Sequence, residues 1–302
     1  MSTGRKVLLA FGGYALLMVL VAVLFGSDGK NDAFQPQNEF LLEPWINLKI
    51  AGIDMSINKA VLYIVLASAL TCIAMVYIAN RMTAKPNKVQ MAVEVIYDVL
   101  RQQITRDNLD EKMSVKWFPF LGTLFFFILF SNFIGLIPLP TNTAETFSLF
   151  GLNIPSFALY AATANISIPL VLTLVVWIAY NVEGVRAHGP IGYLKTWLPA
   201  GLESMNPIGK FLIFLIEAIS QFVRLISLSV RLFANILAGH LLLLFMGGGL
   251  AVLLGISALG ILTFPMAFAF YIFEIIIVAG LQAFIFAILT AIYLGGATSG
   301  AH

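Results

Sequence analysis

The fold is decided by residues 212–249, which read LIFLIEAISQFVRLISLSVRLFANILAGHLLLLFMGGG. Arg231 lies in the middle of this apolar run. A guanidinium keeps its proton at any accessible pH, and placing it near the centre of a bilayer costs about 3 kcal/mol or more. A cation held there is expected to face protein or water and to act electrostatically. If the run is helical, one face carries a polar stripe made of Glu217, Arg224, Ser227, Arg231 and Asn235.

The composition is that of an integral membrane protein. Of the 302 residues, 60% are hydrophobic and 11% are charged, whereas a soluble domain carries about 25% charged residues. The mean hydropathy is +0.95. The net charge of +2 comes with no basic stripe, which argues against nucleic-acid binding. Cys72 is the only cysteine, so the chain has neither a disulfide framework nor a cysteine metal cluster.

The apolar segments predict an all-α, polytopic membrane protein with about six membrane-embedded helices. The segments are 7–25, 60–79, 117–138, 157–181, 211–246 and 250–294. We interpret 7–25 as a retained anchor because it exceeds the usual core of a signal peptide and no clear A-x-A site follows, with a cleaved signal peptide as the alternative. We therefore expect residues 1–59 to form an N-terminal anchor and external segment, and residues 60–302 to form the main membrane domain.

Lysine and arginine placement predicts the topology. Segments 80–116 and 182–210 carry basic residues, whereas 139–156 and 247–252 carry none. With one crossing in each span, both basic segments and the C-terminus lie on the same side. That side is the cytoplasm of a bacterium or, alternatively, a mitochondrial matrix.

Two segments depart from simple crossings. Residues 87–106 have apolar side chains at three- and four-residue steps, which predicts an amphipathic helix that lies on the membrane or contacts a soluble partner. A helix over 211–246 would be about 54 Å long, against a hydrocarbon core of about 30 Å. We expect one steeply inclined helix there, with a kink or two short spans as the alternative. Pro265 favours a break in the last segment.

Four stretches of the sequence form recognisable motifs: SLSVRLFANILAGH at 227–240, SNFIGLIPLP at 131–140, LQAFIFAILTAIYL at 281–294 and TANIS at 163–167. Together they resemble subunit a of the F-type ATP synthase. The resemblance spans roughly 60–295 and makes 60–302 the subunit a membrane domain. It implies one upright helix, an amphipathic surface helix and two membrane hairpins. The last hairpin would be long, inclined and packed on a ring of small proteolipid subunits.

The resemblance implies a role for Arg231 as the essential arginine, which faces the carboxylate carried by each ring subunit. A charge pair at about 4 Å and an effective dielectric near 20 attracts by about 4 kcal/mol, which favours the ionised carboxylate beside the arginine. A permanent cation also separates two offset half-channels for protons. Small residues near it, such as Ser227 and Ala234, would let a partner helix approach closely.

Other family positions are implied residue by residue. Glu217 matches an acid near the cytoplasmic end of the same helix, and we expect it to line the exit path for protons. Arg224 occupies a position that is often basic in the family; alternatively, its side chain pairs with Glu217 or with a lipid headgroup. His240 and Glu274 match a relay pair facing each other across the hairpin, and histidine suits proton transfer near neutral pH. Gln282 matches a glutamine that contacts the essential arginine, and Asn235 belongs to the Arg231 motif.

One spacing departs from the family. The relay group and the glutamine are usually seven residues apart, whereas Glu274 and Gln282 are eight apart. Either a π-bulge near Gly280 absorbs the extra residue, or Glu274 is not the equivalent group. Asn132, Asn165 and Glu145 are further candidates for the external half-channel, with helix packing through amide hydrogen bonds as the alternative for the asparagines.

No enzymatic motif is present, so we expect a non-catalytic subunit without a cofactor. The expected partners are the c-subunit ring, b-type peripheral stalk subunits, other ATP synthase subunits, membrane lipids and translocated protons. The alternative function is a secondary ion-coupled transporter, which predicts an inverted repeat that the sequence does not show. An intramembrane enzyme or an inert assembly protein is a weaker rival, because catalytic clusters are missing and buried cations are present.

Overall fold

The computed structural model describes residues 3–25, 44–50, 53–54, 56–83, 86–137, 146–149, 152–155, 162–198, 206–249, 251 and 256–299. Among these residues, five helical segments are long and apolar enough to cross a membrane. They are Lys59–Tyr77, Glu111–Gly135, Ser167–His188, Pro207–Gly247 and Leu262–Thr298. The first predicted segment is also helical, in α1 (Thr3–Phe25). The prediction of an all-α, polytopic membrane protein is confirmed.

The chain divides into two compact units, and each is described by itself. The first unit comprises Met1–Lys59, Leu136–Leu159 and Leu237–Ile276. The second unit comprises Ala60–Gly135, Tyr160–Ile236 and Ile277–His302.

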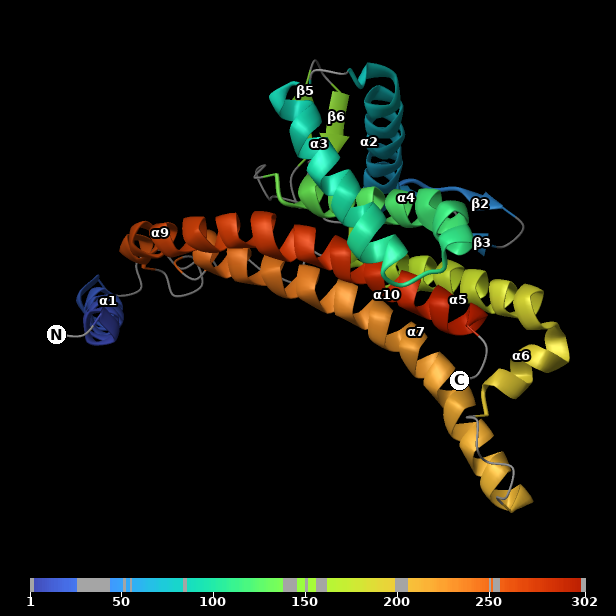
Figure 1. The fold of residues 1–302 in the computed structure, drawn as a ribbon. Helices are drawn as coiled ribbons and strands as arrows, with labels where there is room; N and C mark the ends of the chain where they lie inside the picture. Colours follow the sequence, from blue (N-terminus) through green and yellow to red (C-terminus); the bar gives the residue numbers. More distant parts are fainter. Residues whose placement is uncertain are drawn as a thin grey trace. The chain divides into compact units, whose positions relative to one another are not determined.

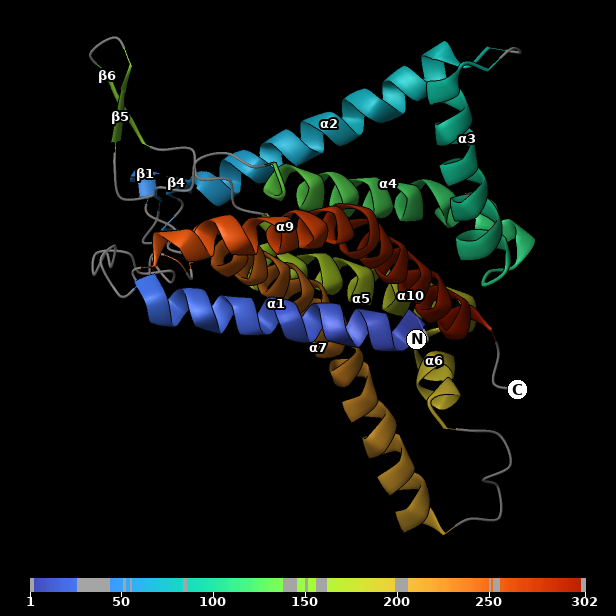
Figure 2. The same ribbon diagram turned by 90° about the vertical axis from the view of Figure 1, so that its left-hand side faces the viewer.

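The core of the second unit is built around α10 (Gly280–Thr298), which packs on both α4 (Glu111–Gly135) and α5 (Ser167–His188) (Figure 1 and Figure 2). Ala283, Ala287 and Ala291 on α10 are fully buried at four-residue spacing. Small side chains at this spacing let helices approach closely, which in a bilayer is a main source of helix association. Phe286 is also fully buried and fills the space beside this alanine stripe.

The predicted amphipathic segment 87–106 is helical, as α3 (Lys88–Val99) followed by the π-helical η2 (Leu100–Arg106). The Asn87 side chain accepts a hydrogen bond of 2.7 Å from the backbone N–H of Gln90 and so caps α3. In η2, Leu100 and Ile104 are buried, and η2 packs on α4 and α10. The contact is close at Gly295, where an added Cβ would collide with the Asn108 carbonyl.

The fourth predicted span begins later than expected. The sequence pattern predicted 157–181, whereas α5 covers Ser167–His188 and is preceded by the 3-10 helix η3 (Ala162–Ala164). Asn165 sets this boundary, because its side-chain oxygen accepts a 3.0 Å hydrogen bond from the Ser167 N–H. Pro169 follows in the first turn, where its missing N–H costs no helical bond. Beyond α5, α6 (Pro190–Thr196) begins after Gly189, whose φ of 72° favours glycine.

The polar-striped segment forms one long helix, as predicted. It is α7 (Pro207–Leu244), which has 38 residues and is followed by the π-helical η4 (Phe245–Gly249). Figure 1 shows α7 as one continuous helix. The last segment also stays helical, through α9 (Ser257–Phe273), η5 (Glu274–Ala279) and α10. Pro265 lies inside α9 and does not end it. Another helix of the second unit, α2, covers Lys59–Arg81.

The first unit joins α1, η4 and α9 with three short two-stranded sheets. α9 packs on η4 and on α1, and the Tyr14 hydroxyl of α1 donates a hydrogen bond to the Leu262 carbonyl (Figure 2). The antiparallel pairs are β1 (Pro44–Ile46) with β4 (Ile57–Asn58), β2 (Lys49–Ile50) with β3 (Ile53–Asp54), and β5 (Thr146–Leu149) with β6 (Leu152–Pro155).

Candidate functional site

Arg231 lies on an exposed face of α7. Leu228, Leu232 and Ile236 are buried at four-residue spacing on the face that packs inside the second unit. Arg231 is exposed, and so are Ser227 and Ala234 one turn to either side. Among the residues that the structure describes, none forms an ion pair or hydrogen bond with Arg231. The guanidinium is therefore presented outward, in a setting of small side chains.

Asn235 and Gln282 form a direct link between α7 and α10. The Asn235 side-chain N–H donates to Gln282 Oε1 at 2.8 Å. Gln282 is only 2% exposed, and its Nε2 is buried with no hydrogen-bond partner among the described residues. A buried amide donor is costly to leave unpaired. The pair lies one helical turn from Arg231 along α7.

Glu217 and Arg224 are brought together near the start of α7. Arg224 Nη2 lies 3.0 Å from Glu217 Oε1, and the two side chains are 36% and 30% exposed. Of the alternatives for Arg224, the structure shows the pairing with Glu217. The same carboxyl oxygen accepts a 3.1 Å hydrogen bond from Gln221 Nε2.

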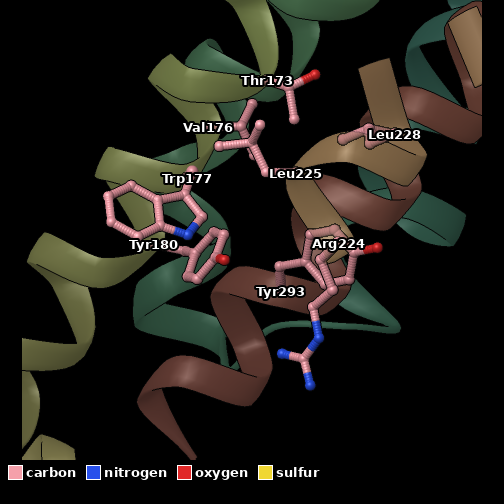
Figure 3. A pocket seen from close by; sticks show the side chains of 8 residues that line it. All are labelled: Thr173, Val176, Trp177, Tyr180, Arg224, Leu225, Leu228 and Tyr293. Carbon is pink, nitrogen blue, oxygen red and sulfur yellow. The ribbon is translucent and has the colours of Figure 1, made fainter. Parts of the chain in front are cut away.

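Arg224 also borders a small pocket at the junction of α5, α7 and α10. The pocket is lined by Thr173, Val176, Trp177, Tyr180, Arg224, Leu225, Leu228 and Tyr293 (Figure 3). The Arg224 guanidinium carbon lies 5.8 Å from the centre of the Tyr293 ring, which is a cation–π distance. Figure 3 shows the guanidinium beyond the tyrosine rings, pointing away from Thr173.

His240 and Glu274 come together inside the first unit. His240 Nδ1 lies 3.9 Å from Glu274 Oε1, and the side chains are 13% and 4% exposed. Gly239 makes this approach possible, because an added Cβ would occupy the position of the Glu274 carboxyl group. This separation is beyond direct hydrogen-bond reach, so a proton passes between the two groups only through one bridging water or after a closer approach.

The unusual spacing before Gln282 coincides with a π-helical segment. η5 begins at Glu274 and ends at Ala279, immediately before Gly280. A π-helical turn holds more residues than an α-helical turn, because its hydrogen bonds run from i to i+5. Of the two explanations offered for the eight-residue spacing, the structure thus contains the π-bulge.

The remaining candidates from the sequence are Asn132, Asn165 and Glu145. Asn132 is fully buried, accepts a 2.9 Å hydrogen bond from Thr163 Oγ1 and donates at 3.4 Å to the Ala279 carbonyl. It therefore makes the amide packing contacts that were the alternative to a channel role. Asn165 lies just before α5 and accepts the hydrogen bond from Ser167 that marks its start, as described above. Glu145 lies outside the described residues.

The two basic segments meet in the second unit. Lys116 Nζ at the start of α4 lies 2.5 Å from Glu183 Oε1 near the end of α5, and Arg186 Nη1 lies 3.7 Å from Glu183 Oε2. The C-terminal part of α10 reaches the same end, where Gly295 contacts Asn108. Among the described residues, no group of three or more His, Cys, Asp or Glu side chains could hold a metal ion.

Sequence reasoning missed several residues that complete these contacts. Gln221 follows Glu217 by four residues, so the helical spacing could have indicated it. Tyr180 and Gly239 gave no local signal, because their contacts come from distant parts of the chain.

The sequence matches the family described as ATP synthase A chain over residues 61–295. The chain belongs to this family. It is 37% identical to ATP synthase subunit a of Rubrobacter xylanophilus, over 83% of this chain and 88% of that protein. It is 32% identical to ATP synthase subunit a of Parvibaculum lavamentivorans, over 88% and 94% respectively. Identity to ATP synthase subunit a of Rhodospirillum rubrum is 30%, over 87% and 97%. The resemblance to subunit a seen in the motifs is confirmed.

Proposed function

We propose that this chain is the proton-conducting stator subunit of an F-type ATP synthase and has no catalytic activity of its own. Membership of the A chain family supports the coarse function, proton translocation in the membrane sector. The observation that carries the finer proposal is Arg231, an exposed arginine on an apolar helix with no ion-pair partner among the described residues. In a bilayer such a cation needs a counter-charge, which a carboxylate on a neighbouring ring supplies.

In this mechanism, protons enter from the external side through a half-channel that includes His240 and Glu274. The proton passes to a ring carboxylate, which becomes neutral and can then face lipid, because a bare anion in hydrocarbon is prohibitively costly. After nearly a full rotation the carboxyl group meets Arg231, which favours its ionised form. The proton leaves through a second path that includes Glu217. Each charge moved contributes about 2.3 kcal/mol per 100 mV.

Gln282 and Asn235 fix the surroundings of Arg231 in this proposal. Their hydrogen bond holds the buried Gln282 amide one turn from the arginine. Ser227 and Ala234 are exposed beside Arg231 and are small enough for a ring helix to approach. We assign Asn132 and Asn165 a supporting role at the external half-channel through the helix contacts that they make.

The same proposal includes the orientation of the chain in the membrane and the partners of the chain. The pairing of Lys116 with Glu183, and the contact of Gly295 with Asn108, support a shared side for both basic segments and the C-terminus. We place that side in the cytoplasm of a bacterium. The partners are the c-ring, b-type stalk subunits and the remaining ATP synthase subunits. Residues 1–59 are an N-terminal extension to the domain 60–302, and the family match begins at residue 61.

The test is Arg231→Ala in the assembled ATP synthase, reconstituted in vesicles. We expect ATP-driven proton pumping to be abolished while the complex still assembles, because the two half-channels are no longer separated by a fixed cation. Arg186→Ala is the matched control, since Arg186 is also exposed but lies at the end of α5, and it should pump normally. Coupled pumping by Arg231→Ala at the rate of the control would refute the proposal.

A further inference from the structure

The carboxyl group of Glu217 is reached by a hydrogen-bond chain that begins on another helix. The Tyr180 hydroxyl of α5 donates to Gln221 Oε1 at 2.8 Å, and Gln221 Nε2 donates to Glu217 Oε1 at 3.1 Å. An ionised carboxylate only accepts hydrogen bonds, so Gln221 must turn its nitrogen to Glu217 and its oxygen to Tyr180. The chain therefore has a single direction, and its members polarise one another.

Two donors converge on the same oxygen of Glu217. Arg224 Nη2 lies 3.0 Å from Oε1, which also accepts from Gln221. Neither bond goes to Oε2, and the Glu217 side chain is 30% exposed. One oxygen is thus held by the protein, and the other is left to exchange a proton with water.

The two donors to Glu217, Gln221 and Arg224, differ in how deeply they are buried. Tyr180 and Gln221 are only 2% and 4% exposed, so their bond is rigid and shielded from water. Arg224 is 36% exposed, and half-exposed ion pairs fix geometry poorly because solvent screens them. The orientation of the Glu217 carboxyl group is therefore set mainly from the buried side.

We propose that Tyr180 and Gln221 are positioning residues that hold the Glu217 carboxyl group in the orientation needed to exchange protons with the cytoplasmic side, in either direction of flow. This inference rests on the proposed function, in which Glu217 belongs to the proton exit path. Proton transfer requires donor and acceptor within hydrogen-bond reach, so a carboxyl group that rotates freely spends less time in a productive geometry.

The Tyr180 hydroxyl can be removed without disturbing its ring. The Tyr180 and Tyr293 rings are 5.9 Å apart, and both line the pocket beside Arg224 (Figure 3). Tyr180→Phe keeps this ring contact and removes only the donor to Gln221. Gln221→Leu breaks the same chain at its second member.

The experiment measures the initial rate of ATP-driven proton pumping per assembled ATP synthase, in vesicles that contain the complete enzyme. We expect Tyr180→Phe and Gln221→Leu each to lower this rate about three- to tenfold, the range for losing one neutral hydrogen bond. The double variant should be no slower than the slower single variant, because both changes break one chain. Tyr193→Phe is the matched control, since its hydroxyl donates to Asn181 instead, at 3.0 Å, and it should pump normally.

A second comparison separates positioning from simple structural support. Glu217→Ala should itself slow pumping, and adding Tyr180→Phe to it should change nothing further. If Tyr180→Phe slows pumping as much in the Glu217→Ala background as in the native chain, the hydroxyl acts elsewhere and the inference fails. If Glu217→Ala pumps at the native rate, the exit role of Glu217 and the inference fail together, while the Arg231→Ala result still decides the proposed stator function.

Discussion

Gly239→Ala tests how closely the relay pair is packed. The added methyl group would occupy the place of the Glu274 carboxyl group, so Glu274 must rotate away or α7 must move back. Keeping the Glu274 carboxyl group in its present place against that methyl group would cost about 1–3 kcal/mol. If proton transfer needs Glu274 in this place beside His240, proton flux drops about 5- to 150-fold.

The assay is passive proton flux through the membrane sector in vesicles after the ATPase head has been removed. Gly122→Ala is the control, because nothing lies within 4 Å of an added Cβ there. Its flux should match that of the native protein. Flux through Gly239→Ala within twofold of this control would refute the reasoning, since it would mean that the carboxyl group of Glu274 has no fixed place beside Gly239.

Two further changes test the core of the second unit, through the thermal stability of the purified complex. Thr163→Val leaves the buried Asn132 Oδ1 without its donor and should lower the free energy of unfolding by about 1–3 kcal/mol. Thr196→Val is its control, because it removes a part-buried hydroxyl that bonds only to the Tyr193 carbonyl of its own helix. Phe286→Ala opens a cavity at a fully buried position and should cost about 3–5 kcal/mol, whereas an unchanged melting temperature would contradict the packing around α10.

Much of the architecture was predictable because the thickness of a bilayer strongly constrains the length of the helices that cross it. The unbroken α7 followed from an apolar run without internal proline, and the amphipathic segment from its three- and four-residue spacing. The start of α5 was not predictable from hydropathy, because the Asn165 side chain and the 3-10 turn before it set the boundary. Pro265 favoured an interruption of the last helical segment, whereas α9 continues through this residue.

The part of the candidate site whose residues lie on a single helix was predictable. Glu217, Arg224 and Asn235 share α7, so their spacing placed them on a common stripe. The contacts of Tyr180 with Gln221, and of Asn132 with Thr163, join segments distant in sequence, and periodicity carries no information about them. The eight-residue spacing of Glu274 and Gln282 shows that one residue is added relative to the family. It does not show where the helix accommodates this residue, so the π-helical η5 was only one of two explanations.

The most direct measurement is the distance between the Arg231 guanidinium and the nearest ring carboxylate in a structure of the assembled complex. The account predicts that one carboxylate of the ring lies within about 4–6 Å of the guanidinium, the range over which opposite charges control ionisation. A guanidinium turned towards lipid headgroups, or paired with an acid of its own chain and remote from every ring carboxylate, would contradict it.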